Sequence, residues 1–277
     1  MSNKSKDTDS KKPETHPRRH AMKRLPIRSL IPNSLTVFAL CAGLTSIRFA
    51  LEGRFEFAVI AILVASIFDG LDGRVARLLR GTSKFGAELD SLTDFVNFGV
   101  APVLVLYLWC LQAWGGLGWI AVLGYAVCCA LRLARFNVDH DDPDRPAWMG
   151  NYFTGVPAPA GALLVMLPLY LSFEGATGLP ELPWLIALHT ALVAFLMVSR
   201  IPSFSGKRLG IKISRDKVAP ILLGVALFAA LWVSYPWIML AALSIGYLIL
   251  LPVSSWRYAQ NKAQQITPYD DPDSHLL

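Results

Sequence analysis

The sequence predicts an all-α polytopic membrane protein, and three observations support this prediction. Hydrophobic residues make up 54% of the 277-residue chain and charged residues only 17%, which is too apolar for an average soluble domain. The apolar residues gather in eight separate segments. Lysine and arginine lie mostly in polar stretches that would all face one side of a membrane.

The N-terminal residues precede the apolar segments. Residues 1–22 are rich in Lys, Asp, Ser, Thr and Pro and have no apolar core, so we expect a disordered basic cytoplasmic tail and no signal peptide. Residues 23–33 mix basic residues with Leu and Ile. This mixture favours a short amphipathic helix on the membrane surface, with additional linker as the alternative.

The eight apolar segments divide the rest of the chain. Several are shorter than the roughly 20 residues that a simple span requires, so their boundaries are approximate. They are Ser34–Leu51, Phe55–Leu79, Leu89–Leu111, Trp119–Phe136, Val156–Phe173, Trp184–Val198, Val218–Val233 and Trp237–Val253. We expect a six-span core over 34–200, a cytoplasmic basic loop over 201–217, two additional spans over 218–253 and a polar cytoplasmic tail over 254–277.

The positions of lysine and arginine predict the orientation. With the N-terminus in the cytoplasm, all 26 of these residues except Arg48 and Arg54 lie on the cytoplasmic side. We therefore expect a protein integral to the cytoplasmic (inner) membrane, with both termini facing the cytoplasm.

Four aspartates, two in the second segment and two in the third, form the candidate site. On a helix, two acids, a glycine and an arginine share one face, and two further acids lie one turn apart on the next helix. Glycine, Thr and Ser between the helices favour a tight connection over 80–86, so the two pairs of acids should face each other. The residues are Asp69, Asp72, Gly73 and Arg77 on the first helix and Asp90 and Asp94 on the second.

The four carboxylates predict a metal site that faces the cytoplasm. They would repel one another unless cations are present, and two divalent ions would cancel their charge. Oxygen-only ligands, with no Cys or His in the stretch, indicate Mg²⁺ or Mn²⁺, and paired ions of this kind serve phosphoryl transfer. A solvated acidic hairpin paired with nearby basic residues is the alternative. The apolar flanks place these acids at a membrane boundary, where ionisable groups are costly and functional.

The spacing of these residues resembles the signature of the CDP-alcohol phosphotransferase family. The pattern is D-x-x-D-G-x-x-A-R, then eight residues, then G-x-x-x-D-x-x-x-D. The resemblance implies a six-helix core bundle, here with two added helices, a homodimer, and two metal ions held by the four aspartates. It also implies that the last acid is the general base. The matching residues are Asp69, Asp72, Gly73, Ala76, Arg77, Gly86, Asp90 and Asp94.

The resemblance further implies a nucleotide site beside the acids. Gly73 and Gly86 would let a nucleotide approach bare backbone, with close helix packing as the alternative. Pro32, Asn33 and Thr36 are similar to a P-N-x-x-T element of the family, although Pro32 also suits a helix start. The residues expected to bind CDP-diacylglycerol are Asn33, Gly73, Ala76, Arg77, Ser83 and Gly86.

Three polar stretches indicate the acceptor alcohol. R-L-A-R-F-N at 132–137, F-x-G-x-P-x-P at 153–159 and S-R-I-P-S-F-S at 199–205 are similar to the membrane-spanning bacterial phosphatidylserine synthases. The resemblance covers roughly residues 30–207 and implies that L-serine and CDP-diacylglycerol give phosphatidylserine and CMP. An arginine could bind the serine carboxylate in bidentate fashion, unless both arginines only anchor the span. The expected serine-binding residues are Arg132, Arg135, Asn137, Tyr152 and Thr154.

Two other functions stay open at this point. A sister enzyme would use glycerol phosphate, an inositol phosphate or choline as the acceptor. A cation transporter could also carry intramembrane acids, but it would not explain the glycines and arginine between them. We expect membrane lipid and no nucleic acid as a partner.

Overall fold

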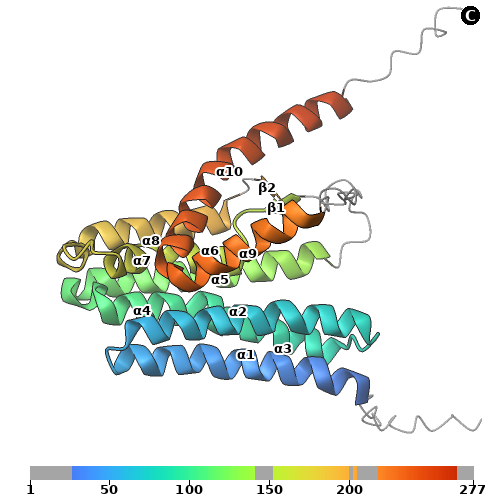
Figure 1. Ribbon diagram of the computed structural model, residues 1–277, viewed down its shortest axis with the longest axis horizontal. Coiled ribbons are helices and arrows are strands. Elements are labelled where there is room, and N and C mark those ends of the chain that lie inside the picture. The colour runs from blue at the N-terminus through green and yellow to red at the C-terminus, as the bar shows by residue number, and fades with distance from the viewer. Residues whose placement is uncertain (1–26, 141–151, 200–201, 205–217, 267–277) are drawn as a thin grey trace, which may run out of the picture.

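The computed structural model describes residues 27–140, 152–199, 202–204 and 218–266, and nearly all of them are helical (Figure 1). The helices are α1 (Ile27–Leu51), α2 (Phe55–Leu78), α3 (Lys84–Asp94), α4 (Ala101–Trp109), α5 (Gly116–His140), α6 (Ala158–Val165), α7 (Leu167–Phe173), α8 (Pro183–Val198), α9 (Val218–Ser234) and α10 (Pro236–Ile266). Every predicted apolar segment corresponds to one helix or to consecutive helices. Figure 1 shows α1 beside α2 at one edge of the bundle and α10 extending away from it.

By length and composition, three helices of the described residues can cross a membrane: Arg28–Leu51, Lys84–Trp109 and Gly116–Val138. Helix α2 has 24 residues but carries the charged motif, whereas Ala158–Phe173 and Pro183–Val198 are shorter apolar helices. These features confirm the predicted all-α polytopic membrane protein. Helices α9 and α10 are bent by 113°, so the two further spans expected over 218–253 form one broken span or a re-entrant loop by the same criteria.

Helix α1 begins earlier than the first predicted span. Residues 27–33, for which we expected a separate surface helix, are continuous with that span, while residues 23–26 lie outside the described part. The prediction that Pro32 starts a helix is wrong, because Pro32 lies inside α1. Proline has no N–H, so the Arg28 carbonyl lacks its usual helical donor. The backbone of Gly81 approaches this carbonyl so closely that a Cβ would lie 2.5 Å from its oxygen.

The connection between α2 and α3 is shorter than predicted. Ser83 caps α3, and its hydroxyl accepts a hydrogen bond of 3.0 Å from the backbone N–H of Gly86. Gly86 therefore belongs to α3 and not to the turn. The helix continues after Asp94 through a π-helical segment, η1 (Phe95–Val100), into α4.

The sequence did not predict a small antiparallel ribbon between β1 (Tyr152–Thr154) and β2 (Pro202–Phe204). The next residue, Gly155, has a φ of +79°, and a Cβ there would lie 2.5 Å from the Met197 carbonyl oxygen. Only glycine suits this backbone conformation and this close approach. The ribbon thereby lies against the C-terminal end of α8.

The buried core lies where α5, α6 and α8 pack around η1 and α4. Among its largest fully buried side chains are Tyr125, Phe98 and Tyr170. Pro102 has no N–H for the Phe98 carbonyl four residues earlier, and the Tyr125 hydroxyl donates to that carbonyl at 3.0 Å. This bond ties α5 to the π-helical segment that follows Asp94.

Candidate active site

Three of the four motif aspartates converge. One carboxylate oxygen from each of Asp69, Asp90 and Asp94 lies within 4.8 Å of the other two. Asp69 projects from α2, and the other two project from α3 one turn apart. The predicted hairpin thus brings acids from both of its helices together.

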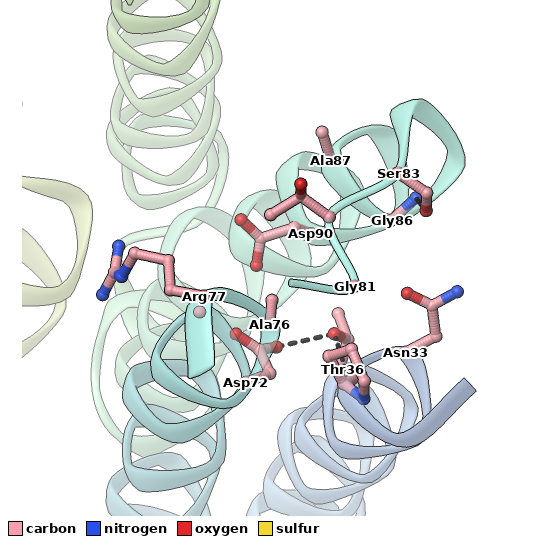
Figure 2. A pocket seen from close by; sticks show the side chains of 13 residues that line it. Asn33, Thr36, Asp72, Ala76, Arg77, Gly81, Ser83, Gly86, Ala87 and Asp90 are labelled. Atoms are coloured by element: carbon pink, nitrogen blue, oxygen red, sulfur yellow. Dashed lines mark hydrogen bonds between the residues drawn. The ribbon is translucent and has the colours of Figure 1, made fainter. Parts of the chain in front are cut away.

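The fourth acid, Asp72, is positioned by α1. Its side chain is only 5% exposed, and it accepts a hydrogen bond of 2.6 Å from the Thr36 hydroxyl (Figure 2). It lies outside the group of three and lines a pocket together with Asp90. Thr36 therefore holds one acid between the cluster and the pocket.

The arrangement of the acids is more consistent with a site for a divalent cation than with a hairpin whose acids pair with nearby basic residues. No Lys or Arg among the described residues forms an ion pair with any of them, although Arg74, Arg77, Arg80 and Lys84 are close in sequence. Oδ1 of Asp94 is buried and has no hydrogen-bond partner in the described part of the chain. Clustered, partly buried carboxylates without a cation are unfavourable, and an all-oxygen donor set suits Mg²⁺ or Mn²⁺. These acids could hold a metal.

A pocket of about 200 Å³ opens beside the acids, between the N-terminal part of α1, the end of α2 and the start of α3. Figure 2 shows Asn33 and Arg77 on opposite sides of the two acids that line it. Pro32 and Thr36 of the P-N-x-x-T element also line it, as do Gly81, Thr82 and Ala87, which we did not predict. The pocket includes all six residues that we expected to contact CDP-diacylglycerol: Asn33, Gly73, Ala76, Arg77, Ser83 and Gly86.

The two motif glycines differ in their surroundings. A Cβ on Gly73 would meet no atom within 4 Å, so helix packing does not account for this glycine. A Cβ on Gly86 would lie 2.8 Å from the Asn33 Oδ1 atom and 3.1 Å from the Ser83 hydroxyl. The open space at Gly73 leaves room for a ligand, whereas Gly86 also allows α1 to approach α3.

The two candidate arginines of α5 have different environments. Arg132 is only 8% exposed, its Nε has no hydrogen-bond partner among the described residues, and its guanidinium lies 5.5 Å from the Phe136 ring centre. Arg135 instead donates to the Val198 carbonyl at 2.8 Å, which ties α5 to the end of α8. Of the two arginines, Arg132 is therefore the one whose guanidinium still has a donor that could bind a ligand.

The other expected acceptor residues follow these arginines in the chain. Asn137 donates to the Ser91 hydroxyl at 3.0 Å and so links the end of α5 to α3. Tyr152 and Thr154 form the two ends of β1, and their side chains lie outside the described part of the structure.

Comparison with known proteins adds to this geometry. Residues 29–198 match the family model of CDP-alcohol phosphatidyltransferases, and residues 217–252 match a second model, CDP-alcohol phosphatidyltransferase 2. A CDP-diacylglycerol–serine O-phosphatidyltransferase of Mycobacterium tuberculosis is 41% identical over 244 residues, covering 87% of this chain and 83% of that protein. Proteins of the same name are 43% identical in Mycobacterium leprae, covering 80% and 73%, and 36% identical in Helicobacter pylori, covering 66% and 76%.

Proposed function

The chain belongs to the CDP-alcohol phosphatidyltransferase family, and we propose that it transfers the phosphatidyl group of CDP-diacylglycerol to the hydroxyl of L-serine. The products are phosphatidylserine and CMP. The observation that carries this proposal is the pocket lined by all six expected nucleotide contacts directly beside the converging aspartates. The serine acceptor rests on the identity to relatives named for this reaction over most of the chain.

The pocket suits the nucleotide end of the donor. Its volume of about 200 Å³ is below the roughly 300–1,000 Å³ of pockets that enclose a whole drug-sized ligand. The cytidine diphosphate part would therefore enter between α1, α2 and α3, and the acyl chains would stay in the bilayer. Arg77 and Asn33 would contact it from opposite sides.

We infer that Asp69, Asp72, Asp90 and Asp94 hold two Mg²⁺ or Mn²⁺ ions. When bound, these ions would polarise the diphosphate and balance the charge of the departing CMP. The family typically uses divalent metals, and the arrangement of the acids supports their presence here.

Asp94 is the residue best placed to act as the base. Its buried Oδ1 has no hydrogen-bond partner among the described residues, so it is available to accept the proton of the serine hydroxyl. The serine oxygen then forms a bond to the phosphorus that carries diacylglycerol, and the bond from this phosphorus to the CMP oxygen breaks. Arg77 would bind the negative charge of the leaving CMP, since it lines the same pocket.

The protein is integral to the membrane, and we infer that its site faces the cytoplasm. All but two of the 26 Lys and Arg residues lie in the segments assigned to that side. The inferred setting is the cytoplasmic membrane, with both termini inside and two copies forming a homodimer, as the family resemblance implies.

An acceptor panel tests the proposed function. Purified protein would be given CDP-diacylglycerol labelled in its acyl chains, a divalent metal, and serine, glycerol phosphate, inositol, inositol phosphate or choline separately. We expect labelled phosphatidylserine and an equal amount of CMP with serine alone. A lipid product with a different acceptor would identify a sister enzyme, and no CMP with any acceptor would favour the transporter.

Replacing Gly73 with Ala is expected to raise the KM for CDP-diacylglycerol about tenfold, which corresponds to about 1.4 kcal/mol. The added methyl would occupy ligand space, because the pocket beside Gly73 is open. Steady-state kinetics with varied CDP-diacylglycerol measures this effect.

Gly70→Ala is the matched control for this variant. Gly70 lies in the same helix, a Cβ there also meets nothing within 4 Å, and the residue does not line the pocket. Both variants should gain a similar small stability, because alanine favours a helix over glycine by roughly 0.5–1 kcal/mol. An unchanged KM in Gly73→Ala would remove Gly73 from the nucleotide site.

Replacing Arg132 with Lys is expected to raise the KM for serine about tenfold, or about 1.4 kcal/mol, with little change for CDP-diacylglycerol. Lysine keeps the charge but cannot form the bidentate pair with a carboxylate. In Arg135→Lys, the ammonium can still donate to the Val198 carbonyl, so serine kinetics should stay normal. Normal serine kinetics in both variants would refute the assignment of Arg132.

A further inference from the structure

A sharp turn at the end of α1 fixes the position of Arg54. Gly53 has a φ of +72°, and its N–H donates to the Ala50 carbonyl at 3.0 Å. The next N–H, that of Arg54, donates to the Phe49 carbonyl at 2.9 Å. These two bonds end a helix at a glycine in the left-handed region and hold the residue that follows against the last turn. Figure 1 shows this turn at the end of α2 that is remote from α3.

The side chain of Arg54 is held between two aromatic rings. Its guanidinium carbon lies 5.0 Å from the centre of the Phe49 ring and 4.3 Å from that of Phe57, and both contacts favour a cation. Glu52 is shared by two arginines, at 3.0 Å from Arg48 and 3.6 Å from Arg54. Two guanidinium groups therefore face one carboxylate, which leaves one positive charge without a counter-charge in this group of three residues.

A cavity of about 320 Å³ opens beside Arg54. One of its walls comes from α7, where the Phe173 ring lies 4.8 Å from the Trp237 ring of α10. Glu56 also lines the cavity and forms no ion pair with any described residue. The cavity therefore offers a guanidinium, a carboxylate and aromatic rings to a ligand. Its lining residues are Gly53, Arg54, Phe55, Glu56, Phe57 and Phe173.

The cavity lies at the level of the lipid headgroups. It directly follows Arg28–Leu51, a helix that can cross a membrane, and the end of such a helix meets the headgroup layer. It shares no lining residue with the pocket beside the aspartates. About 14 residues of α2 separate Phe55 from Asp69, which corresponds to about 21 Å along the helix. The cavity is therefore a second site, toward the other membrane surface.

We propose that this cavity binds the headgroup of a zwitterionic phospholipid, with the phosphate on Arg54 and the ammonium on Glu56. A guanidinium forms bidentate hydrogen bonds with phosphate, and a carboxylate accepts hydrogen bonds from an ammonium group. The phenylalanine rings contact the apolar part of the lipid next to its headgroup. One cation and one acid in the same cavity favour a headgroup with both charges over one with a phosphate alone. The inference is independent of the proposed function, because it uses no residue of the candidate active site.

The test is lipid binding to the full-length protein in detergent, measured by native mass spectrometry. The probes are phosphatidylethanolamine and phosphatidylglycerol with identical acyl chains, and we expect phosphatidylethanolamine to bind more tightly. Arg54→Lys keeps the charge but loses the bidentate fork, so it should weaken the binding of both lipids about fivefold. Glu56→Gln removes only the partner of the ammonium. It should weaken phosphatidylethanolamine about fivefold and should not weaken phosphatidylglycerol.

Arg48→Lys is the matched control for Arg54→Lys. Arg48 pairs with the same glutamate, but its side chain is 76% exposed and does not line the cavity, so both lipids should bind as they do to the wild type. Equal losses in Arg48→Lys and Arg54→Lys would overturn the site, as would equal affinities of the wild type for the two lipids or unchanged phosphatidylethanolamine binding in Glu56→Gln.

Serine transfer should stay at the wild-type rate in all three variants, because the cavity is remote from the aspartates. The two proposals can therefore fail separately. Wild-type protein that binds phosphatidylethanolamine as expected but forms no phosphatidylserine would overturn only the proposed function. Wild-type protein that forms phosphatidylserine without preferring either lipid would overturn only the lipid site.

Discussion

Asp94→Asn is expected to lower turnover about 10³-fold while CDP-diacylglycerol binding stays measurable. The amide cannot accept the proton of the serine hydroxyl, and Oδ1 of Asp94 is the buried carboxylate oxygen that has no partner among the described residues. The pocket that we propose for the nucleotide is lined by Asp72 and Asp90 and not by Asp94, so donor binding should survive. Single-turnover rates and equilibrium binding of CDP-diacylglycerol would be measured on the same preparation.

Asp69→Asn provides the comparison for this result. Asp69 belongs to the same cluster but has no proposed role in proton transfer, so its replacement should weaken metal-dependent donor binding as well as turnover. If Asp94→Asn loses binding to the same extent, then Asp94 is a metal ligand only, and the base must be sought elsewhere.

Complete removal of divalent metal is expected to abolish transfer and to lower the melting temperature. Three carboxylate oxygens lie within 4.8 Å of one another, and no basic residue among those described pairs with them, so their repulsion is unbalanced without cations. A ligand present at 100 times its dissociation constant stabilises the folded state by about 2.7 kcal/mol. The melting curve, recorded with and without a chelator, should shift by several degrees and recover when Mg²⁺ or Mn²⁺ is restored.

The matched control for metal removal is again Asp69→Asn. Its melting temperature should respond less to the chelator, because one shared ligand is missing and the repulsion is already reduced. A wild-type melting temperature that stays constant after all metal is removed would count against a shared metal site at these aspartates.

The sequence by itself determined the class of fold and indicated which residues would gather at the candidate site. Helical periodicity is local, so the spacing of Asp69, Asp72 and Gly73 was enough to place them near one face of α2. The short polar turn before Ser83 brought Asp90 and Asp94 back toward them. For the same reason, the six expected nucleotide contacts could be named from the motif and its flanks, and all of them line one pocket.

Only the tertiary structure decided how distant segments complete the site. Arg132 and Arg135 are equivalent in the sequence pattern, and they differ because the end of α8 offers a carbonyl to Arg135 and none to Arg132. Thr36 holds Asp72 from another helix, and Asn137 at the end of α5 donates to Ser91 of α3. Contacts of this kind depend on which helix faces pack together and on bends such as the 113° turn between α9 and α10. Periodicity along one segment carries no information about them, because packing joins residues that are far apart in the chain.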